Sequence, residues 1–278
     1  MGTPLGNFIR TKRDSIQPES LGLHRHGRRR SPGLRRLDLA TRAGISVEYL
    51  ARIEQGRDHN PSPAVVNSLA DALCLDPSER NHLRYLAKIS GDQCSVQITP
   101  VPPPRRVRPA VLRTLCLLEP GVALVTNRLG DVLAHTTGFQ SITSGTGLLD
   151  AAEPNLNRYL FTDPRSRAFF VDWDDIADEH TFDLWQAPSL ENLEWLTSEL
   201  TPVAGPEFTN RLSRHVVPRR DVLRLDHPDG HQLRLLRETL ELPMDAQQLV
   251  IFLPECDQTA QAIDQLRRQS HGRLRSIS

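Results

Sequence analysis

The segment 34–57 constrains the fold of this chain more than any other part of the sequence. Its apolar residues recur at helical spacing on both sides of Gly44, which can adopt a positive φ and end a helix. Ser46 then provides a good N-cap for a second helix. The inward positions of the two predicted helices are Leu39, Ala40, Ala43, Leu50 and Ile53. Two short helices joined by a tight turn are typical of a helix-turn-helix, whose second helix lies in the major groove of DNA.

Four stretches of sequence carry a resemblance to a known family. They are LGNFIRTKRD, RRRSPGLRR, AGISVEYLARIEQGR and PSPAVVNSLADAL, all between Leu5 and about Leu86. Together they resemble the XRE-type regulators that carry a MmyB-like ligand-binding domain. The resemblance is close over this N-terminal part and looser from Pro109 to about Leu253. It implies a PAS-like second domain that binds a small hydrophobic ligand such as a fatty acid.

Length and charge divide the chain into two parts. A length of 278 residues favours about two domains. Residues 1–90 hold 15 Lys and Arg against 9 Asp and Glu, whereas residues 91–278 hold 19 against 25. A basic module ahead of an acidic remainder suits a nucleic-acid-binding domain attached to another domain. We predict a helix-turn-helix domain at 1–90, a proline-rich linker at 91–108, a MmyB-like domain at 109–255, and a C-terminal helix and tail at 256–278.

The apolar pattern predicts the fold class of each domain. The first should be an all-α, lambda-repressor-like domain of five helices. The second should be α+β, because strands are predicted at both of its ends and helices between them. The family resemblance implies that this α+β domain is PAS-like. The predicted strands are 122–126, 132–135, 222–225, 232–242 and 248–253. The helices predicted between them include 155–160, 164–177, 190–200 and 206–214.

Composition disfavours membrane, secreted and metal-binding classes. The longest apolar runs, such as 249–253, are far too short to span a bilayer. The N-terminus lacks an apolar signal region, so we expect a cytoplasmic protein whose four cysteines are reduced thiols. Two His and two Asp cluster at 226–231, but Pro228 and Gly230 indicate a hairpin turn there. Because the sequence has no P-loop, dinucleotide fingerprint or nucleophile elbow, we expect no enzyme, no cofactor and no metal.

The outward positions of the second helix are the candidates for reading base edges. These positions are Val47, Glu48, Ala51 and Arg52. Arg52 could bond guanine bidentately and Glu48 could accept from cytosine N4, or the two could simply pair with each other as i, i+4 neighbours. Further DNA contacts are predicted at Arg28, Arg29, Arg30, Arg36, Ser46, Gln55 and Arg57. For the three consecutive arginines, an idle solvated loop is the alternative.

Glu54 is expected to have a structural role instead of a DNA contact. In the family that the sequence resembles, a glutamate at this place pairs with an arginine of the first helix. Arg13 matches that arginine best. Breaking such a partly buried pair on one side only is costly.

The ligand site is predicted only through the apolar residues of the second domain. The candidates are Leu124, Phe139, Phe161, Phe170, Trp173 and Leu235, each of which could instead be ordinary core. The sequence departs from the family pattern at His135-Thr136, where Trp-Asn is usual, and at Leu212, where a tryptophan is usual. We predict a homodimeric transcription regulator on double-stranded DNA with a palindromic operator. The alternatives are a second domain that only recruits another protein, or an enzyme fused to a DNA-binding domain.

Overall fold

The computed structural model describes residues 3–22, 33–91, 100–185, 187, 190–216, 218 and 221–273. These residues fall into two compact units. The first contains the described residues up to 91 together with those from 210 to 216. The second contains those from 100 to 209 and from 218 onward.

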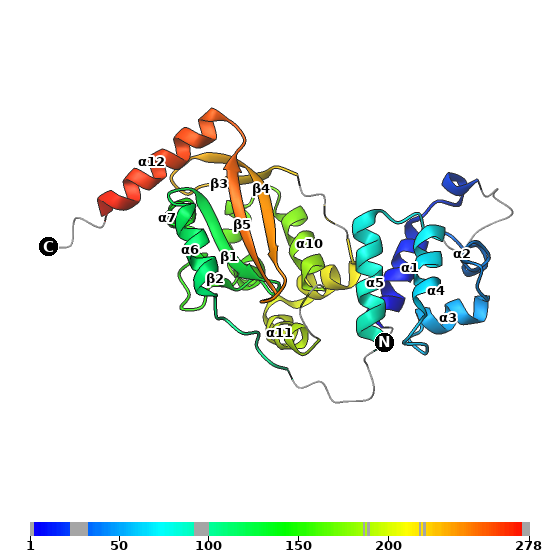
Figure 1. Ribbon diagram of the computed structural model, residues 1–278. Coiled ribbons are helices and arrows are strands. Elements are labelled where there is room, and N and C mark those ends of the chain that lie inside the picture. The colour runs from blue at the N-terminus through cyan, green and yellow to red at the C-terminus, as the bar shows by residue number, and fades with distance from the viewer. Residues whose placement is uncertain are drawn as a thin grey trace. The chain divides into compact units, whose positions relative to one another are not determined.

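The first unit is helical throughout its described residues (Figure 1). Its elements are α1 (Pro4–Ser15), the short 3-10 helix η1 (Pro18–Leu21), α2 (Arg36–Ala43), α3 (Val47–Glu54), α4 (Pro63–Ala72) and α5 (Pro77–Gly91). Ser62 caps α4, as its sequence predicts. Before α5, Asp76 and Glu79 exchange the two hydrogen bonds of a capping box. These results confirm the predicted all-α helix-turn-helix class for this part of the chain.

The end of α11 (Leu190–Arg214) and the residues that follow it also belong to the first unit. His215 is buried there, and its Nδ1 lies 3.2 Å from Nε2 of His82 on α5. Phe8 of α1 makes edge contacts with both imidazole rings. Burial, followed by the nearby His215 and Lys12, lowers the pKa of His82 to about 3. Burial, followed by Lys12, lowers the pKa of His215 to about 4, so both rings are neutral at pH 7.

The second unit is built on an antiparallel sheet, which has five strands within the described residues. The strands are β1 (Val122–Asn127), β2 (Val132–His135), β3 (Leu223–Asp226), β4 (Gln232–Leu242) and β5 (Gln247–Pro254). Their spatial order is β2-β1-β5-β4-β3, so the N-terminal hairpin pairs with the C-terminal strands. In this register Leu124 lies opposite Val250, and Arg237 lies opposite Phe252. The predicted α+β, PAS-like class is confirmed.

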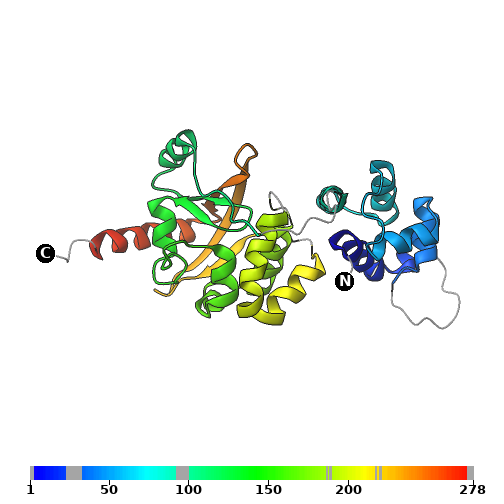
Figure 2. The same ribbon diagram turned by 90° about the horizontal axis from the view of Figure 1, so that it is seen from below.

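Helices cover both faces of this sheet (Figures 1 and 2). One face packs against α6 (Pro109–Leu117), through Val111 and Leu115. The larger core lies on the opposite face and includes residues of the helices α7 (Thr137–Ile142), α8 (Leu156–Thr162), α9 (Arg165–Phe169), α10 (Trp173–Leu184) and α12 (Asp257–Arg273). The C-terminal helix is therefore part of this unit's core, through Ala262, Ile263 and Leu266.

The stretch 164–177 is not the single helix that its periodicity predicts. It divides into α9 and α10 at residues 170–172. There the N–H of Val171 donates to the carbonyl of Arg224 at 3.1 Å, and the Asp172 carboxylate receives the Arg224 guanidinium. Pairing with β3 thus replaces helical hydrogen bonds, which is a tertiary effect that local periodicity does not contain.

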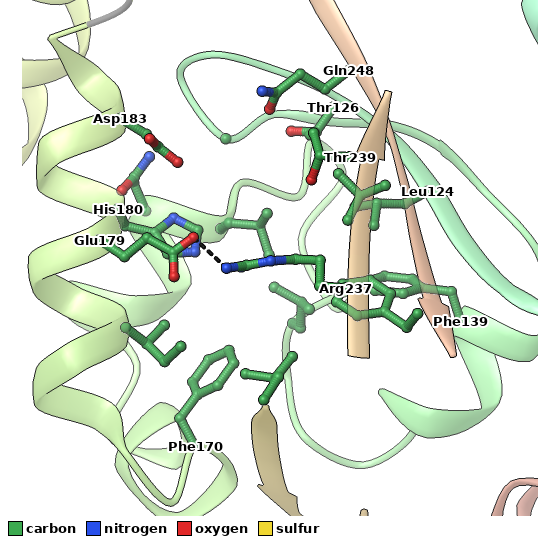
Figure 3. Close-up of a pocket in the computed structure, with 18 of the residues that line it drawn as sticks. Leu124, Thr126, Phe139, Phe170, Glu179, His180, Asp183, Arg237, Thr239 and Gln248 are labelled. Atoms are coloured by element: carbon green, nitrogen blue, oxygen red, sulfur yellow. Dashed lines mark ion pairs between the residues drawn. The ribbon is translucent and has the colours of Figure 1, made fainter. Parts of the chain in front are cut away.

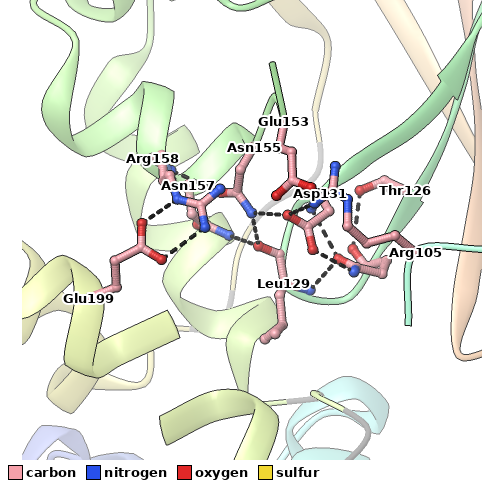
Figure 4. Close-up of polar contacts among 10 residues, drawn as sticks. Arg105, Thr126, Leu129, Asp131, Glu153, Asn155, Asn157, Arg158 and Glu199 are labelled. Atoms are coloured by element: carbon pink, nitrogen blue, oxygen red, sulfur yellow. Dashed lines mark hydrogen bonds and ion pairs between the residues drawn. The ribbon is translucent and has the colours of Figure 1, made fainter. Parts of the chain in front are cut away.

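A buried polar cluster attaches the proline-rich segment 100–108 to the second unit (Figure 4). At its centre is Asp131, which is wholly buried. Its carboxylate accepts from Nδ2 of Asn127 at 2.8 Å and from Nδ2 of Asn155 at 2.9 Å. Nη1 of Arg105 lies 2.7 Å from the same carboxylate. The chain leading into α6 is therefore held in place by the β1–β2 turn.

Candidate functional site

The helix α3 begins and is oriented as a recognition helix requires. Gly44 has φ of 66°, and the N–H of Ile45 donates to the carbonyl of Ala40 at 3.0 Å, which ends α2. Ser46 Oγ then accepts from the N–H of Tyr49 at 3.0 Å, which begins α3. The buried face of α3 consists of Leu50, Ile53 and Glu54. The predicted DNA-contact residues on α3 and next to it all lie exposed or half-buried: Ser46, Val47, Glu48, Ala51, Arg52, Gln55 and Arg57.

Arg52 forms its ion pair with Asp58 rather than with Glu48 in the part of the chain that the structure describes. Its Nη2 lies 3.3 Å from Oδ2 of Asp58, and its side chain is 59% exposed. An exposed pair at this distance contributes little to stability. The guanidinium can therefore exchange Asp58 for a guanine edge or a phosphate at low cost.

Glu54 joins three parts of the first unit beneath this surface. Its Oε1 accepts from Nε of Arg13 on α1, and its Oε2 accepts from Nε of Arg36 on α2, each at 2.7 Å. The glutamate is fully buried, and the Arg13 side chain is 8% exposed. The predicted pairing of Arg13 with Glu54 is confirmed. Arg36, which we predicted to contact DNA, donates one hydrogen bond to Glu54, and its side chain is 40% exposed.

The close approach of α1 to the end of α3 depends on Gly6. A Cβ at this position would lie 2.6 Å from the carbonyl oxygen of Glu54. A contact this short with backbone cannot be relieved by a rotamer change, so α1 would have to move. The arginines Arg28, Arg29 and Arg30 lie outside the described residues.

A cavity of about 100 Å³ lies between the sheet and α10 in the second unit (Figure 3). For comparison, an apolar cavity of about 150 Å³ is enough to bind benzene in another protein. Of the predicted ligand residues, Leu124, Phe139 and Phe170 line this cavity. The other three predicted residues do not line it: Trp173 and Leu235 belong to the core cluster of the second unit, and Phe161 packs against that cluster.

Those three residues have contacts that explain their position. Nε1 of Trp173 donates to Ser166 Oγ at 3.1 Å, which fixes the indole in the core. Phe161 makes edge contacts with Trp173 and Phe208. Leu235 is completely buried within the same core cluster.

Charged residues of the cavity wall were not among the predicted site residues. Arg237 of β4 forms an ion pair with Glu179 of α10 at 2.5 Å. His180 and Asp183 of α10 line the same space. Strand alternation could have indicated Arg237, because it follows Leu235 on the inward face. The acidic run around α10 suggests a solvated face instead, because the sequence does not show which side of this helix meets the sheet.

The structure shows no metal-binding group in its described residues. None of their His, Cys, Asp and Glu side chains gather in threes as a metal site would need. The predicted turn at 227–230 is present, with the N–H of His227 donating to the carbonyl of His231 at 2.8 Å. No described helix combines the length and the apolar character needed to cross a bilayer.

Comparison with protein families agrees with this two-part architecture. The model of the MmyB-like transcription regulator ligand binding domain matches residues 107–266, which is more than half of the chain. The model of a helix-turn-helix domain matches residues 21–83, which include α2, α3 and α4. No curated protein matches the chain. With an exposed recognition helix in one unit and a lined cavity in the other, the chain belongs to the family of MmyB-like transcription regulators.

Proposed function

We propose that this DNA-binding transcription regulator acts in the cytoplasm as a homodimer on a palindromic operator. Its operator affinity would change when a small hydrophobic ligand occupies the cavity of the second unit. The observation that carries the proposal is the joint presence of an exposed α3 and a lined cavity in one chain. A ligand that binds one dimer geometry better than another shifts the population toward that geometry.

DNA reading would use the outward side of α3. Arg52 is long, exposed and held only by a weak surface pair, which suits a bidentate contact to guanine. Val47 and Ala51 are placed to contact a thymine methyl group. Ser46, Gln55 and Arg57 flank them, so they would meet phosphates and fix the register. Two-fold symmetry would set the half-sites about one helical turn apart.

The outer face of β4 and β5 supports dimer formation. Leu236, Leu240 and Leu253 are 44%, 53% and 46% exposed there, and Leu236 lies directly opposite Leu253. Homodimer interfaces bury apolar surface of this kind. We expect Leu240→Glu to reduce the molar mass measured by light scattering from that of a dimer to that of a monomer. A wild-type protein that is already monomeric at micromolar concentration contradicts the dimer.

The same leucines favour a second candidate function, in which the second unit recruits another protein without any small molecule. Thermal shift separates the two candidates. A ligand that binds only the folded protein raises its melting temperature, and the rise grows with the logarithm of the ligand concentration once the site is saturated. We expect acyl-chain compounds to raise it, because the cavity is lined by leucine and phenylalanine. A panel of apolar metabolites that leaves the melting temperature unchanged would favour recruitment of a protein.

Selection of bound fragments from genomic DNA tests the DNA-binding part of the proposal. The purified full chain should enrich a small set of fragments that share an inverted repeat. Enrichment of fragments without a shared motif contradicts sequence-specific reading. The same fragments supply the operator duplex on which the affinities of wild type and Arg52→Ala can be compared.

A further inference from the structure

The wall of the cavity contains a buried ion pair. Arg237 reaches from β4 across to α10, where its Nη2 lies 2.5 Å from Oε1 of Glu179 (Figure 3). The two side chains are only 16% and 6% exposed, so water screens their attraction little. A buried pair of this kind resists opening, because each charge would lose its compensation if the other moved away.

The other arginine among the described lining residues also has a carboxylate partner. Nη2 of Arg128, in the β1–β2 turn, lies 2.8 Å from Oε2 of Glu241 on β4. Asp183 adds another acid to the wall, one helical turn beyond Glu179. A negatively charged ligand would therefore meet arginines that already have carboxylate partners.

The wall also has hydroxyl and amide groups beside its apolar side chains. On the inward side of the sheet these belong to Thr126, Thr239 and Gln248. Oγ1 of Thr126 donates to the carbonyl of Asn127 and Nε2 of Gln248 donates to Glu241, so these two groups mainly offer acceptor atoms, whereas a threonine hydroxyl such as that of Thr239 can donate and accept. Thr239 lies in the same cross-strand row as Leu124, through Val250 of the strand between them. Apolar side chains and neutral polar groups therefore face the same space.

We propose that this cavity selects an apolar ligand with a neutral hydrogen-bonding head, such as an alcohol or a primary amide, and discriminates against a free carboxylate. The proposal rests on the proposed function, since it takes the cavity as the ligand site. A carboxylate could gain an arginine partner in the described wall only by displacing Glu179 from Arg237 or Glu241 from Arg128. A neutral head requires neither change.

Four compounds with the same eight-carbon chain test the selection. Octan-1-ol, octanamide, octanoate and octylamine are titrated into the full-length protein by calorimetry at pH 7.5. We expect the alcohol or the amide to bind at least tenfold more tightly than octanoate and octylamine. Octanoate or octylamine binding as tightly as the alcohol and the amide overturns the selection but leaves a ligand-binding cavity. Absence of binding by all four overturns the ligand-sensing function, and the selection with it.

A substitution at the ion pair gives a second test. Glu179→Gln keeps the shape of the side chain but releases Arg237, so octanoate should gain at least tenfold in affinity while octan-1-ol changes little. The matched control is Glu238→Gln, on the outward face of β4 next to Arg237, which should change neither affinity. Unchanged octanoate affinity in a folded Glu179→Gln protein contradicts the proposal. If that variant does not fold, the wild-type series of four compounds decides.

Discussion

At the scale of single residues, Glu54 is the residue of the first unit that links three helices through its side chain and its backbone position. One buried carboxylate holds arginines from α1 and α2, and it sits at the end of the recognition helix itself. This carboxylate therefore ties α3 to both neighbouring helices, in addition to the apolar contacts of Leu50 and Ile53. Under the proposed function, the exposed residues of α3 would be free to vary with the operator, whereas Glu54 would not.

Replacing Glu54 with glutamine should destabilise the first unit by up to roughly 3–5 kcal/mol, because Arg13 would keep its buried charge with only the half-exposed Asp14 as counter-charge. Urea unfolding of the full-length protein, followed by circular dichroism, measures this change. The matched control is Glu48→Gln, which removes an exposed carboxylate from the same helix and should leave the midpoint nearly unchanged. Equal midpoints for the two variants would show that the ion-pair cluster contributes little.

The sequence predicts some of these residues and misses others for clear reasons. The pairing of Arg13 with Glu54 follows from the family resemblance, and the caps at Ser46 and Ser62 follow from local chemistry. The contact of Arg36 with Glu54 could not be predicted in this way, because it depends on where α2 lies against α3. Arg237 was missed because its ion-pair partner, Glu179, lies on a helix. The strand pattern alone does not show that this helix packs over Arg237.

At the scale of elements, α11 shows how a local break and a long-range contact work together. Its residue Gly205 has φ of 62° and ψ of −149°, a conformation essentially restricted to glycine, and two prolines flank it. The sequence predicts two helices here, 190–200 and 206–214, and the structure places a non-helical residue between them. Element boundaries set by glycine and proline are thus predictable, whereas the break between α9 and α10 is not.

Substituting Gly205 with alanine should destabilise the second unit by about 1–3 kcal/mol, because a Cβ makes this backbone conformation strained. The urea transition of the second unit, monitored by tryptophan fluorescence, measures the effect. Val203→Ala, at a position 70% exposed in the same helix, serves as the control and should be close to neutral. A Gly205→Ala protein as stable as the control would mean that α11 can straighten without cost.

The buried histidine pair predicts how the stability of the first unit depends on pH. The folded-state pKa values, about 3 for His82 and about 4 for His215, lie below the value of about 6.5 expected in the unfolded chain. Unfolding therefore takes up protons below pH 6.5, and stability falls as the pH is lowered. Between pH 6.5 and pH 5 the loss should be on the order of 2 kcal/mol for each histidine.

Thermal melts between pH 7.5 and pH 5 check this dependence. In His82→Gln the fall in melting temperature should become shallower, because one titrating group is removed. The exposed His59 provides the control, since His59→Gln should retain the wild-type slope. A slope that does not change in His82→Gln would show that other groups control the acid sensitivity.

At the scale of the whole molecule, the two halves of the chain differ in charge and in task. The first 90 residues carry an excess of basic side chains, and the remainder carries an excess of acidic ones. The basic part holds the exposed recognition helix, and the acidic part holds the cavity. The sequence predicts this division well, because net charge and motif spacing are local properties. The cavity could not be predicted in the same way, because the described part of its wall combines four strands of the sheet, β1, β3, β4 and β5, with the helices α7 to α10.

The affinity of the full-length protein for its selected operator, with and without Arg52, tests the central claim most directly. Fluorescence anisotropy is measured on the operator duplex and on a scrambled duplex, for wild type, Arg52→Ala and the control Arg84→Ala on α5. If α3 reads bases through Arg52, Arg52→Ala should lose about 1–3 kcal/mol on the operator, roughly 5- to 150-fold in affinity. Arg84→Ala should match wild type, and the scrambled duplex should distinguish the variants far less. Equal operator affinity of wild type and Arg52→Ala would contradict base reading by α3 through Arg52.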